Sequence, residues 1–190
     1  MMRIITGKAK GIRLKTLEGE ATRPTTERVK ESVFSMLQFD IEGRSVLDLF
    51  AGSGQMGLEA VSRGAQDAVL VDRSKDAIRI IGENVEKTKL GVSCRVVQSD
   101  AVDYLRRNRG RKFDIVFLDP PYAADLYASA LSALWECEAI KPTSMIVCES
   151  DDENPWGEDS KISERFTVQK CVRYGRIVVT LLTPLLSEKE

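Results

Sequence analysis

The chain has 190 residues, of which 43% are hydrophobic and 30% are charged, and its mean hydropathy is −0.20. This composition is typical of one soluble globular domain and excludes disordered, fibrous and disulfide-stapled classes of protein. No apolar run is long enough to cross a bilayer, and the N-terminus has no signal-peptide core. We therefore expect a cytoplasmic protein without a membrane-spanning segment.

Two features of the composition narrow the chemistry. Histidine is absent, and the four cysteines form no C-x-x-C pair. The sequence therefore offers neither a His-based catalytic triad nor a familiar zinc or dithiol motif, and we predict no metal. Any reaction has to use carboxylates, backbone groups, aromatic side chains or a reactive cofactor.

The net charge of −1 is unevenly distributed. Residues 1–30 contain eight Lys or Arg against three Glu, whereas the remainder contains 20 Lys or Arg against 26 Asp or Glu. A basic segment joined to an acidic body favours a polyanionic partner. A solvated strand face with incidental lysines explains the same charge equally well.

The N-terminal region predicts two short elements. The alternating segments Arg3–Gly7 and Gly11–Lys15 flank a Gly/Lys turn, which indicates a β-hairpin. Arg23–Thr26 has the proline and hydroxyls of a helix entry, with Glu27 in the first turn. The apolar residues of this helix share one face and are Val29, Val33, Met36 and Leu37.

From residue 44 onward, apolar strands alternate with helices, which predicts a doubly wound parallel sheet covered on both faces. The strands are expected over Ser45–Phe50, Ala68–Val71, Ser93–Gln98, Phe113–Leu118 and Met145–Cys148. The helices are expected over Gln55–Arg63, Lys75–Thr88, Val102–Arg107 and Leu126–Cys137. The polar stretch Asp151–Ser163 predicts a loop, and the strands of a closing antiparallel hairpin are expected over Phe166–Val172 and Arg176–Leu182.

A glycine-rich turn follows the first of these strands. Gly52, Gly54 and Gly57 satisfy G-x-G-x-x-G, and Asp72 ends the next strand 20 residues after Gly52. Such loops bring the backbone into contact with a cofactor, and the carboxylate on the second strand accepts from ribose hydroxyls. Taken alone, this fingerprint predicts NAD, because the loop amides and the helix dipole suit a pyrophosphate.

Asp48, four residues before Gly52, argues against a pyrophosphate, because its charge would repel phosphates. S-adenosylmethionine has no phosphate and carries a sulfonium and an ammonium, so an acidic loop favours it. The alternative roles are a capping or turn carboxylate for Asp48 and a turn former for Asp72. Asp100 ends the third strand and is placed to accept from an adenine amine, although Ser-Asp is also a common helix start.

The segment Asp119-Pro120-Pro121-Tyr122 follows the fourth strand, at the edge where doubly wound sheets bind ligands. The prolines remove N–H donors, so the Asp119 carboxylate and the Pro120 carbonyl are left as acceptors for an NH₂ group. Tyr122 offers a π-face to a planar base or amide. This arrangement would aim the lone pair of a poorly nucleophilic amine at a sulfonium methyl group. Alternatively, this segment is only a rigid turn after the strand, with a packed tyrosine and no role in binding or catalysis.

These motifs resemble those of the S-adenosylmethionine-dependent amino-methyltransferases. More narrowly, Arg3–Gly7, Arg23–Glu31 and Gly57–Ala65 resemble the bacterial small-subunit ribosomal RNA methyltransferase D family, which methylates N2 of guanine 966 in 16S rRNA. The resemblance implies an α/β, Rossmann-like, seven-stranded class I methyltransferase fold with a mostly parallel sheet, preceded by an N-terminal β-hairpin and helix. It also implies a basic hairpin extension over residues 1–22 and a methyltransferase domain over residues 23–190.

The resemblance and the motifs together assign site residues. The catalytic residues are expected to be Asp119, Pro120 and Tyr122. The residues expected to bind S-adenosylmethionine are Asp48, Ala51, Gly52, Ser53, Gly54, Asp72, Arg73, Asp100 and Ala101. The residues expected to contact RNA are Arg3, Lys8, Lys10, Arg13, Arg23, Thr25 and Arg28.

We expect a monomer whose partner is 16S rRNA or the small ribosomal subunit, assembly intermediates included. Two other amines, N6 of DNA adenine and the amide of a protein glutamine, remain alternative substrates because the same acceptor pair would serve them. An NAD-dependent Rossmann oxidoreductase and a non-enzymatic RNA-binding module are the alternatives from other classes.

Overall fold

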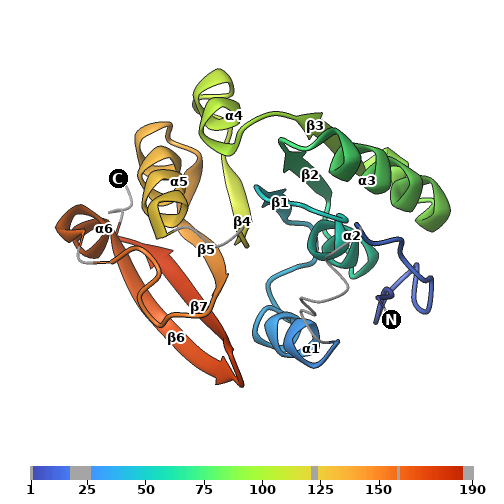
Figure 1. Ribbon diagram of the computed structural model, residues 1–190, viewed down its shortest axis with the longest axis horizontal. Coiled ribbons are helices and arrows are strands. Elements are labelled where there is room, and N and C mark those ends of the chain that lie inside the picture. The colour runs from blue at the N-terminus through green and yellow to red at the C-terminus, as the bar shows by residue number, and fades with distance from the viewer. Residues whose placement is uncertain (1, 18–26, 121–123, 158, 186–190) are drawn as a thin grey trace.

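A computed structural model describes residues 2–17, 27–120, 124–157 and 159–185 (Figure 1). The helices are α1 (Glu27–Met36), α2 (Gln55–Ser62), α3 (Lys75–Thr88), α4 (Ala101–Arg107), α5 (Ala124–Glu136) and α6 (Ser160–Arg165). The strands are β1 (Ser45–Asp48), β2 (Asp67–Asp72), β3 (Cys94–Gln98), β4 (Phe113–Leu118), β5 (Ile140–Ser150), β6 (Phe166–Tyr174) and β7 (Ile177–Pro184). None of the helices in these ranges is long and apolar enough to cross a membrane.

The strands form one sheet in the order β3-β2-β1-β4-β5-β7-β6. Strands β1 to β5 pair in parallel, whereas β7 runs antiparallel to both β5 and β6. The chain leaves β1 towards β2 on one side, and β4 lies on its other side, so the strand order reverses between β1 and β4. Neighbouring loops diverge at such a point and leave a crevice at the carboxyl ends of the strands.

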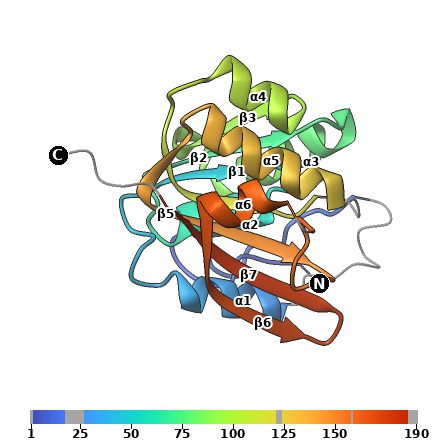
Figure 2. The ribbon, with the colours of Figure 1, turned by 90° about the vertical axis from the view of Figure 1, so that its left-hand side faces the viewer.

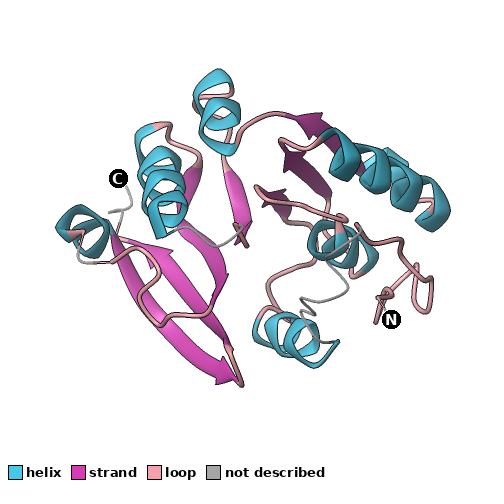
Figure 3. Ribbon diagram, in the orientation of Figure 1, coloured by secondary structure: helices cyan, strands magenta, loops and turns pink. Residues whose placement is uncertain are grey.

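Helices cover both faces of the sheet, as expected for apolar parallel strands (Figures 1 and 3). Val46 of β1 belongs to a buried cluster with Val33 of α1 and Leu58 of α2. Its neighbour Leu47 faces the opposite way and belongs to the cluster that contains Tyr104 of α4. The two-residue period of a strand therefore divides one apolar run between two cores. Beyond β5, strands β6 and β7 lie beside α1 (Figure 2).

The N-terminal segment, residues 2–17, folds back on itself but forms no strand within the described part of the chain. A single antiparallel bridge joins Arg3 to Arg13. The amides of Ile5 and Thr6 donate to the carboxylate of Glu59 on α2, at 2.8 and 3.0 Å. The two arms also pair through their backbones, since the amides of Ile4 and Leu14 donate to the carbonyls of Ile12 and Met2 at 2.9 and 3.0 Å. The segment is therefore a short antiparallel turn at the position of the predicted hairpin, with a single bridge and no regular strands.

This segment packs into the main body of the protein. Ile4, Ala9 and Leu14 are buried and belong to the same cluster as α1 and α2. Gly7 has a φ of +86° and lies so close to α2 that a Cβ there would fall 1.7 Å from the carbonyl oxygen of Ser62. Only glycine allows the N-terminal segment to lie this close to the backbone of α2.

The structure departs most from the predicted elements at a helix that was missed and at the start of β5, and several other element ends differ by one or two residues. The stretch expected to be a loop contains α6, which Asp159 caps by accepting a hydrogen bond of 2.9 Å from the amide of Lys161. Ile162 is the one residue of this helix that is buried, so the apolar pattern was too weak to predict it. Strand β5 also begins five residues earlier than expected, with a register shift opposite Phe113 and Ile115.

Candidate functional site

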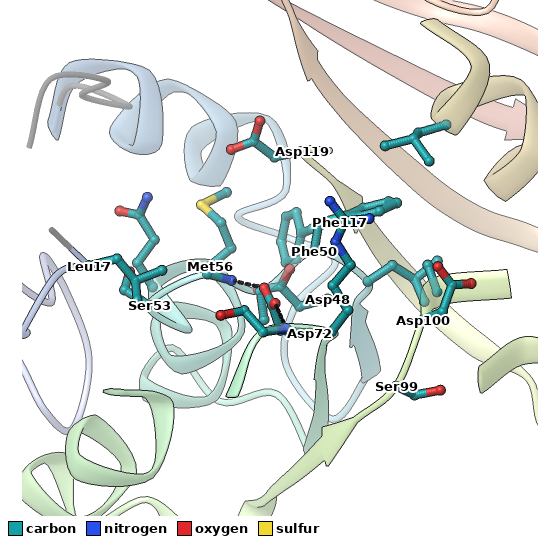
Figure 4. A pocket seen from close by; sticks show the side chains of 18 of the residues that line it. Leu17, Asp48, Phe50, Ser53, Met56, Asp72, Ser99, Asp100, Phe117 and Asp119 are labelled. Carbon is teal, nitrogen blue, oxygen red and sulfur yellow. Dashed lines mark hydrogen bonds between the residues drawn. The ribbon is translucent and has the colours of Figure 1, made fainter. Parts of the chain in front are cut away.

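A pocket of about 360 Å³ lies at the carboxyl ends of the first four parallel strands. Asp48 ends β1, Asp72 ends β2, Asp100 follows β3 and Asp119 follows β4, and all four line the pocket (Figure 4). Arg73 is the one cationic side chain among the described lining residues. The fold therefore collects four carboxylic acids at the point where the strand order reverses.

The turn after β1 depends on its glycines. Gly52 and Gly54 have φ values of +53° and +79°, which side chains disfavour. A Cβ on Gly57 would fall 2.3 Å from a methyl carbon of Leu70, so α2 packs on β2 at a distance that only glycine allows. Gly54 packs near Ile81 and is absent from the pocket wall, unlike the other predicted cofactor residues.

Asp72 joins this turn to the end of β2. Its Oδ2 accepts from the amide of Gly52 at 2.9 Å, and its Oδ1 accepts from the amide of Ser74 at 2.8 Å (Figure 4). A carboxylate has about four lone-pair sites, so acceptor capacity remains for a diol. These two bonds confirm that Asp72 stabilises the turn, and they leave it able to bind a ligand.

Asp48 is buried, and its Oδ2 accepts from the amide of Gly57 at 3.2 Å. The pKa of Asp48 is raised from 3.8 to about 7, mainly by burial and also by the negative charges of Asp119 and Asp72, while hydrogen bonds from Gly57 and Phe50 oppose the shift. A cation in the pocket would favour the charged form of Asp48. The site therefore fits a positively charged ligand better than a pyrophosphate.

Asp100 caps α4, since its Oδ1 accepts from the amides of Val102 and Asp103 at 2.9 and 3.3 Å. The alternative interpretation as a helix start is thus correct, and the residue also borders the pocket beside Ala101 and Ser99. Figure 4 shows Asp48 and Asp72 near the middle, with Ser99 and Asp100 on one side.

Asp119 is half-buried and lines the pocket, and Pro120 after it is buried. The negative charge of Asp119 acts on Asp48, which shows that the ends of β1 and β4 share one site. Tyr122, Arg23 and Thr25, which were also predicted as site residues, lie outside the described residues.

Sequence reasoning missed part of the pocket wall. Met2 and Leu17 of the N-terminal segment line the pocket, and the Ser53 hydroxyl donates to Met2 Sδ at 3.2 Å. Phe50 and Phe117 also line it. Met2 and Leu17 are apolar residues in a basic stretch, and this was the only signal available for them in the sequence.

The predicted RNA contacts that the structure describes are exposed and spread along the protein. They are Arg3, Lys8, Lys10, Arg13 and Arg28. The guanidinium of Arg3 pairs with Glu27 at 2.9 Å, while its bridge neighbour is the like-charged Arg13. Lys8 donates its amide to Ser62 at the carboxyl end of α2, the end away from the glycine turn. Because α2 is about 12 Å long, Lys8 lies about that far from the glycine turn, whereas Arg3 directly follows Met2 of the pocket wall.

Within the described ranges, no group of three or more acidic or cysteine side chains is arranged to hold a metal ion.

The family model described as "Conserved hypothetical protein 95" matches residues 2–183. The Haemophilus influenzae protein "Ribosomal RNA small subunit methyltransferase D" is 35% identical over 156 residues, which cover 81% of this chain and 81% of the relative. The Escherichia coli protein of the same name is 36% identical over 153 residues, covering 80% and 76% of the two chains.

Solved structures share the fold. That of yhhF from Escherichia coli has a TM-score of 0.83 and 30% identity, covering 96% of this chain and 97% of that one. The complex of SMU.776 with SAH has a TM-score of 0.64 and 17% identity, covering 81% and 49%. At that identity, the second likeness concerns the fold alone.

Proposed function

The chain belongs to the family described as "Conserved hypothetical protein 95", and on this premise we propose that it methylates the exocyclic N2 amine of a guanine in 16S rRNA, of the guanine 966 type. The proposed methyl donor is S-adenosylmethionine. The sheet order and its helices form the class I methyltransferase fold. The names of the Haemophilus influenzae and Escherichia coli relatives support ribosomal RNA as the substrate class.

The observation that carries this proposal is the set of four carboxylic acids around a pocket at the point where the strand order reverses. S-adenosylmethionine, when bound, supplies an electrophilic methyl group on a sulfonium. Asp72 would hold the ribose diol, and Asp100 would lie at the adenine end. Asp48 would supply negative charge to the cationic part of the ligand, where a pyrophosphate would be repelled.

The residues after β4 would bind and orient the amine. The lone pair of an exocyclic amine is delocalised into the base, so the free amine is a weak nucleophile. Acceptance of its two N–H groups by the Asp119 carboxylate and the Pro120 carbonyl would favour the pyramidal form and direct the lone pair into the pocket. The methyl group would pass from the sulfonium to N2 with S-adenosylhomocysteine as the leaving group, and the proton that N2 then loses would go to the Asp119 carboxylate or to water. This is catalysis by orientation and by stabilisation of developing positive charge, without a covalent intermediate.

The exposed cations support RNA as the partner. Arg3 and Arg13 are bridge neighbours of like charge, and Arg3 also pairs with Glu27. Phosphates beside Arg13, Lys8 and Lys10 would add favourable charge pairs with these exposed cations. Moving a nucleotide of an RNA loop out of its stack costs little free energy, so its base can leave the stack and reach Asp119.

The experiment supplies methyl-labelled S-adenosylmethionine to the protein with 30S subunits from cells that lack this modification, naked 16S rRNA, duplex DNA and ribosomal proteins. We expect label in RNA alone and N2-methylguanosine after nuclease digestion. Asp119→Ala should lose transfer by at least about 100-fold while still binding S-adenosylhomocysteine. The exposed Asp103→Ala is the charge-matched control. Label confined to DNA or protein would contradict the substrate, and binding of NAD in place of S-adenosylmethionine would contradict the reaction.

A further inference from the structure

The side chain of Asn84 joins two segments that are far apart in the sequence. Asn84 lies on α3 and is fully buried. Its Nδ2 donates to the carbonyl of Ser53 in the glycine turn at 2.9 Å and to the carbonyl of Lys15 at 3.0 Å. Its Oδ1 accepts from the amide of Lys15 at 2.8 Å. One amide group thus satisfies backbone atoms of the pocket turn and of the N-terminal segment.

The same two segments meet at the pocket wall. Ser53 contacts Met2 through its hydroxyl, and Met2 and Leu17 both line the pocket. In Figure 4, Leu17, Ser53 and Met56 lie together on the side of the pocket opposite Ser99 and Asp100. Residues on either end of the N-terminal segment therefore complete a wall that the glycine turn begins.

A buried helix position normally carries an apolar side chain, because an amide has to be fully hydrogen-bonded to be tolerated there. Thr88, one turn further along α3, shows the ordinary arrangement. Its hydroxyl donates only to carbonyls of its own helix, those of Asn84 and Val85. The bonds of Asn84 differ because they leave the helix and reach two other parts of the chain.

We propose that Asn84 is a positioning residue that holds the N-terminal segment as a wall of the cofactor pocket, so that docking of this segment and cofactor binding are coupled. This inference rests on the proposed function, because it takes S-adenosylmethionine as the ligand of the pocket. Coupling of this kind is reciprocal. RNA that binds the docked segment through Lys8, Lys10 and Arg13 therefore also raises the affinity for the cofactor.

Amide hydrogen exchange of residues 2–17 provides a readout that a purely structural role would not move. A ligand that binds only when the segment is docked lowers the population of the undocked state, and with it the rate of amide exchange, by a factor of one plus the ratio of free ligand to Kd. At S-adenosylhomocysteine concentrations of about 100 times Kd, the amides of Ile5, Thr6 and Lys15 should exchange about 100-fold more slowly in the wild-type protein.

The variants are Asn84→Ala and its matched control Thr88→Ala, both on α3 and both buried. Asn84→Ala should bind S-adenosylhomocysteine at least about tenfold more weakly and lose the ligand-dependent protection of residues 2–17. Thr88→Ala should retain both properties. Leu17→Ala, at a half-buried position of the wall, is a second variant that leaves no buried polar group unpaired, and we expect its affinity to fall by about threefold.

The outcomes separate the two claims. S-adenosylhomocysteine binding that is unchanged in Asn84→Ala and in Leu17→Ala, with protection like that of the wild type, would overturn this inference alone. A wild-type protein that does not bind S-adenosylhomocysteine would overturn the proposed function as well.

Discussion

The backbone amide of Gly52 and the carboxylate of Asp72 lie 2.9 Å apart across the ends of β1 and β2. This hydrogen bond ties the glycine turn to the neighbouring strand. Because a second bond from Ser74 fixes the other carboxylate oxygen, the orientation of Asp72 is set before a ligand arrives. Such preorganisation reduces the entropy lost on binding.

Replacing Asp72 tests this arrangement. Asp72→Ala removes both the anchor of the glycine turn and the acceptor for a ribose diol, so affinity for S-adenosylhomocysteine should fall about 10- to 100-fold. Isothermal titration calorimetry measures the loss. The exposed Asp76→Ala, in the first turn of α3, has the same change in charge and should bind normally. Equal affinities for the two variants would contradict the role of Asp72.

The pH dependence of the free energy of unfolding should reveal the ionisation of Asp48. Its folded-state pKa of about 7 lies above the ordinary value of 3.8, so the unfolded chain loses this proton first. The contribution of Asp48 to stability is therefore fully present below about pH 4, is lost as the pH rises to 7 and then stays constant. This loss reaches about 4 kcal/mol in the protein without ligand.

Asp48→Asn removes the ionisation and keeps an acceptor for the Gly57 amide. Chemical denaturation should find the variant more stable than the wild type at pH 8, by up to about 4 kcal/mol, and similar to it at pH 4. Its affinity for S-adenosylmethionine should fall about tenfold, because a neutral amide attracts a cation less. A stability difference that does not vary with pH would contradict this prediction.

Local patterns predicted the parallel sheet and the acidic strand ends because these depend on residues next to one another in the sequence. The apolar run Phe113–Leu118 and the glycine spacing after Asp48 are features of this kind. The pocket wall formed by Met2 and Leu17 could not be predicted, because it depends on hydrogen bonds to Glu59 and Asn84, more than 50 residues away. Asp100 shows that one carboxylate can both cap a helix and border a site.

The exposed cations of the N-terminal segment should carry the salt dependence of RNA binding. Changing Lys8, Lys10 and Arg13 together to Gln should weaken RNA binding and reduce the salt slope by about two to three units, since each phosphate contact contributes about 0.7 to 0.9. Filter binding over a range of salt concentrations measures the slope, and S-adenosylhomocysteine affinity without RNA should be unchanged.

A control with the same change in charge uses exposed cations at and beyond the end of α4, namely Arg106, Arg107 and Lys112. Changing these three residues to Gln should leave the salt slope as in the wild type. An equal loss in both triple variants would mean that net charge, and not the N-terminal segment, determines RNA binding.

Glu59 should be the side chain on which the N-terminal segment depends most. It is fully buried, pairs with Lys30 at 3.3 Å and Arg63 at 2.9 Å, and accepts from the amides of Ile5 and Thr6. Glu59→Ala leaves two amides without their acceptor and the buried Lys30 without its anionic partner, which should cost about 3–5 kcal/mol. For a chain of this length, that lowers Tm by about 10 °C.

Differential scanning calorimetry checks this prediction. Glu83→Ala is the comparison, because Glu83 also pairs with two cations, Lys15 and Arg79, but lies at the surface. Its Tm should change by no more than about 3 °C, as for exposed ion pairs. If the two variants unfolded at the same temperature, the burial of Glu59 would not be the source of its effect.

The most direct measurement is a crystal structure of the protein with S-adenosylhomocysteine. We predict that the ribose lies against Asp72, the adenine towards Asp100, and the sulfur faces the Asp119 and Pro120 oxygens from within the acidic pocket. A ligand bound outside this pocket, or an Asp119 carboxylate directed away from the sulfur, would contradict the mechanism.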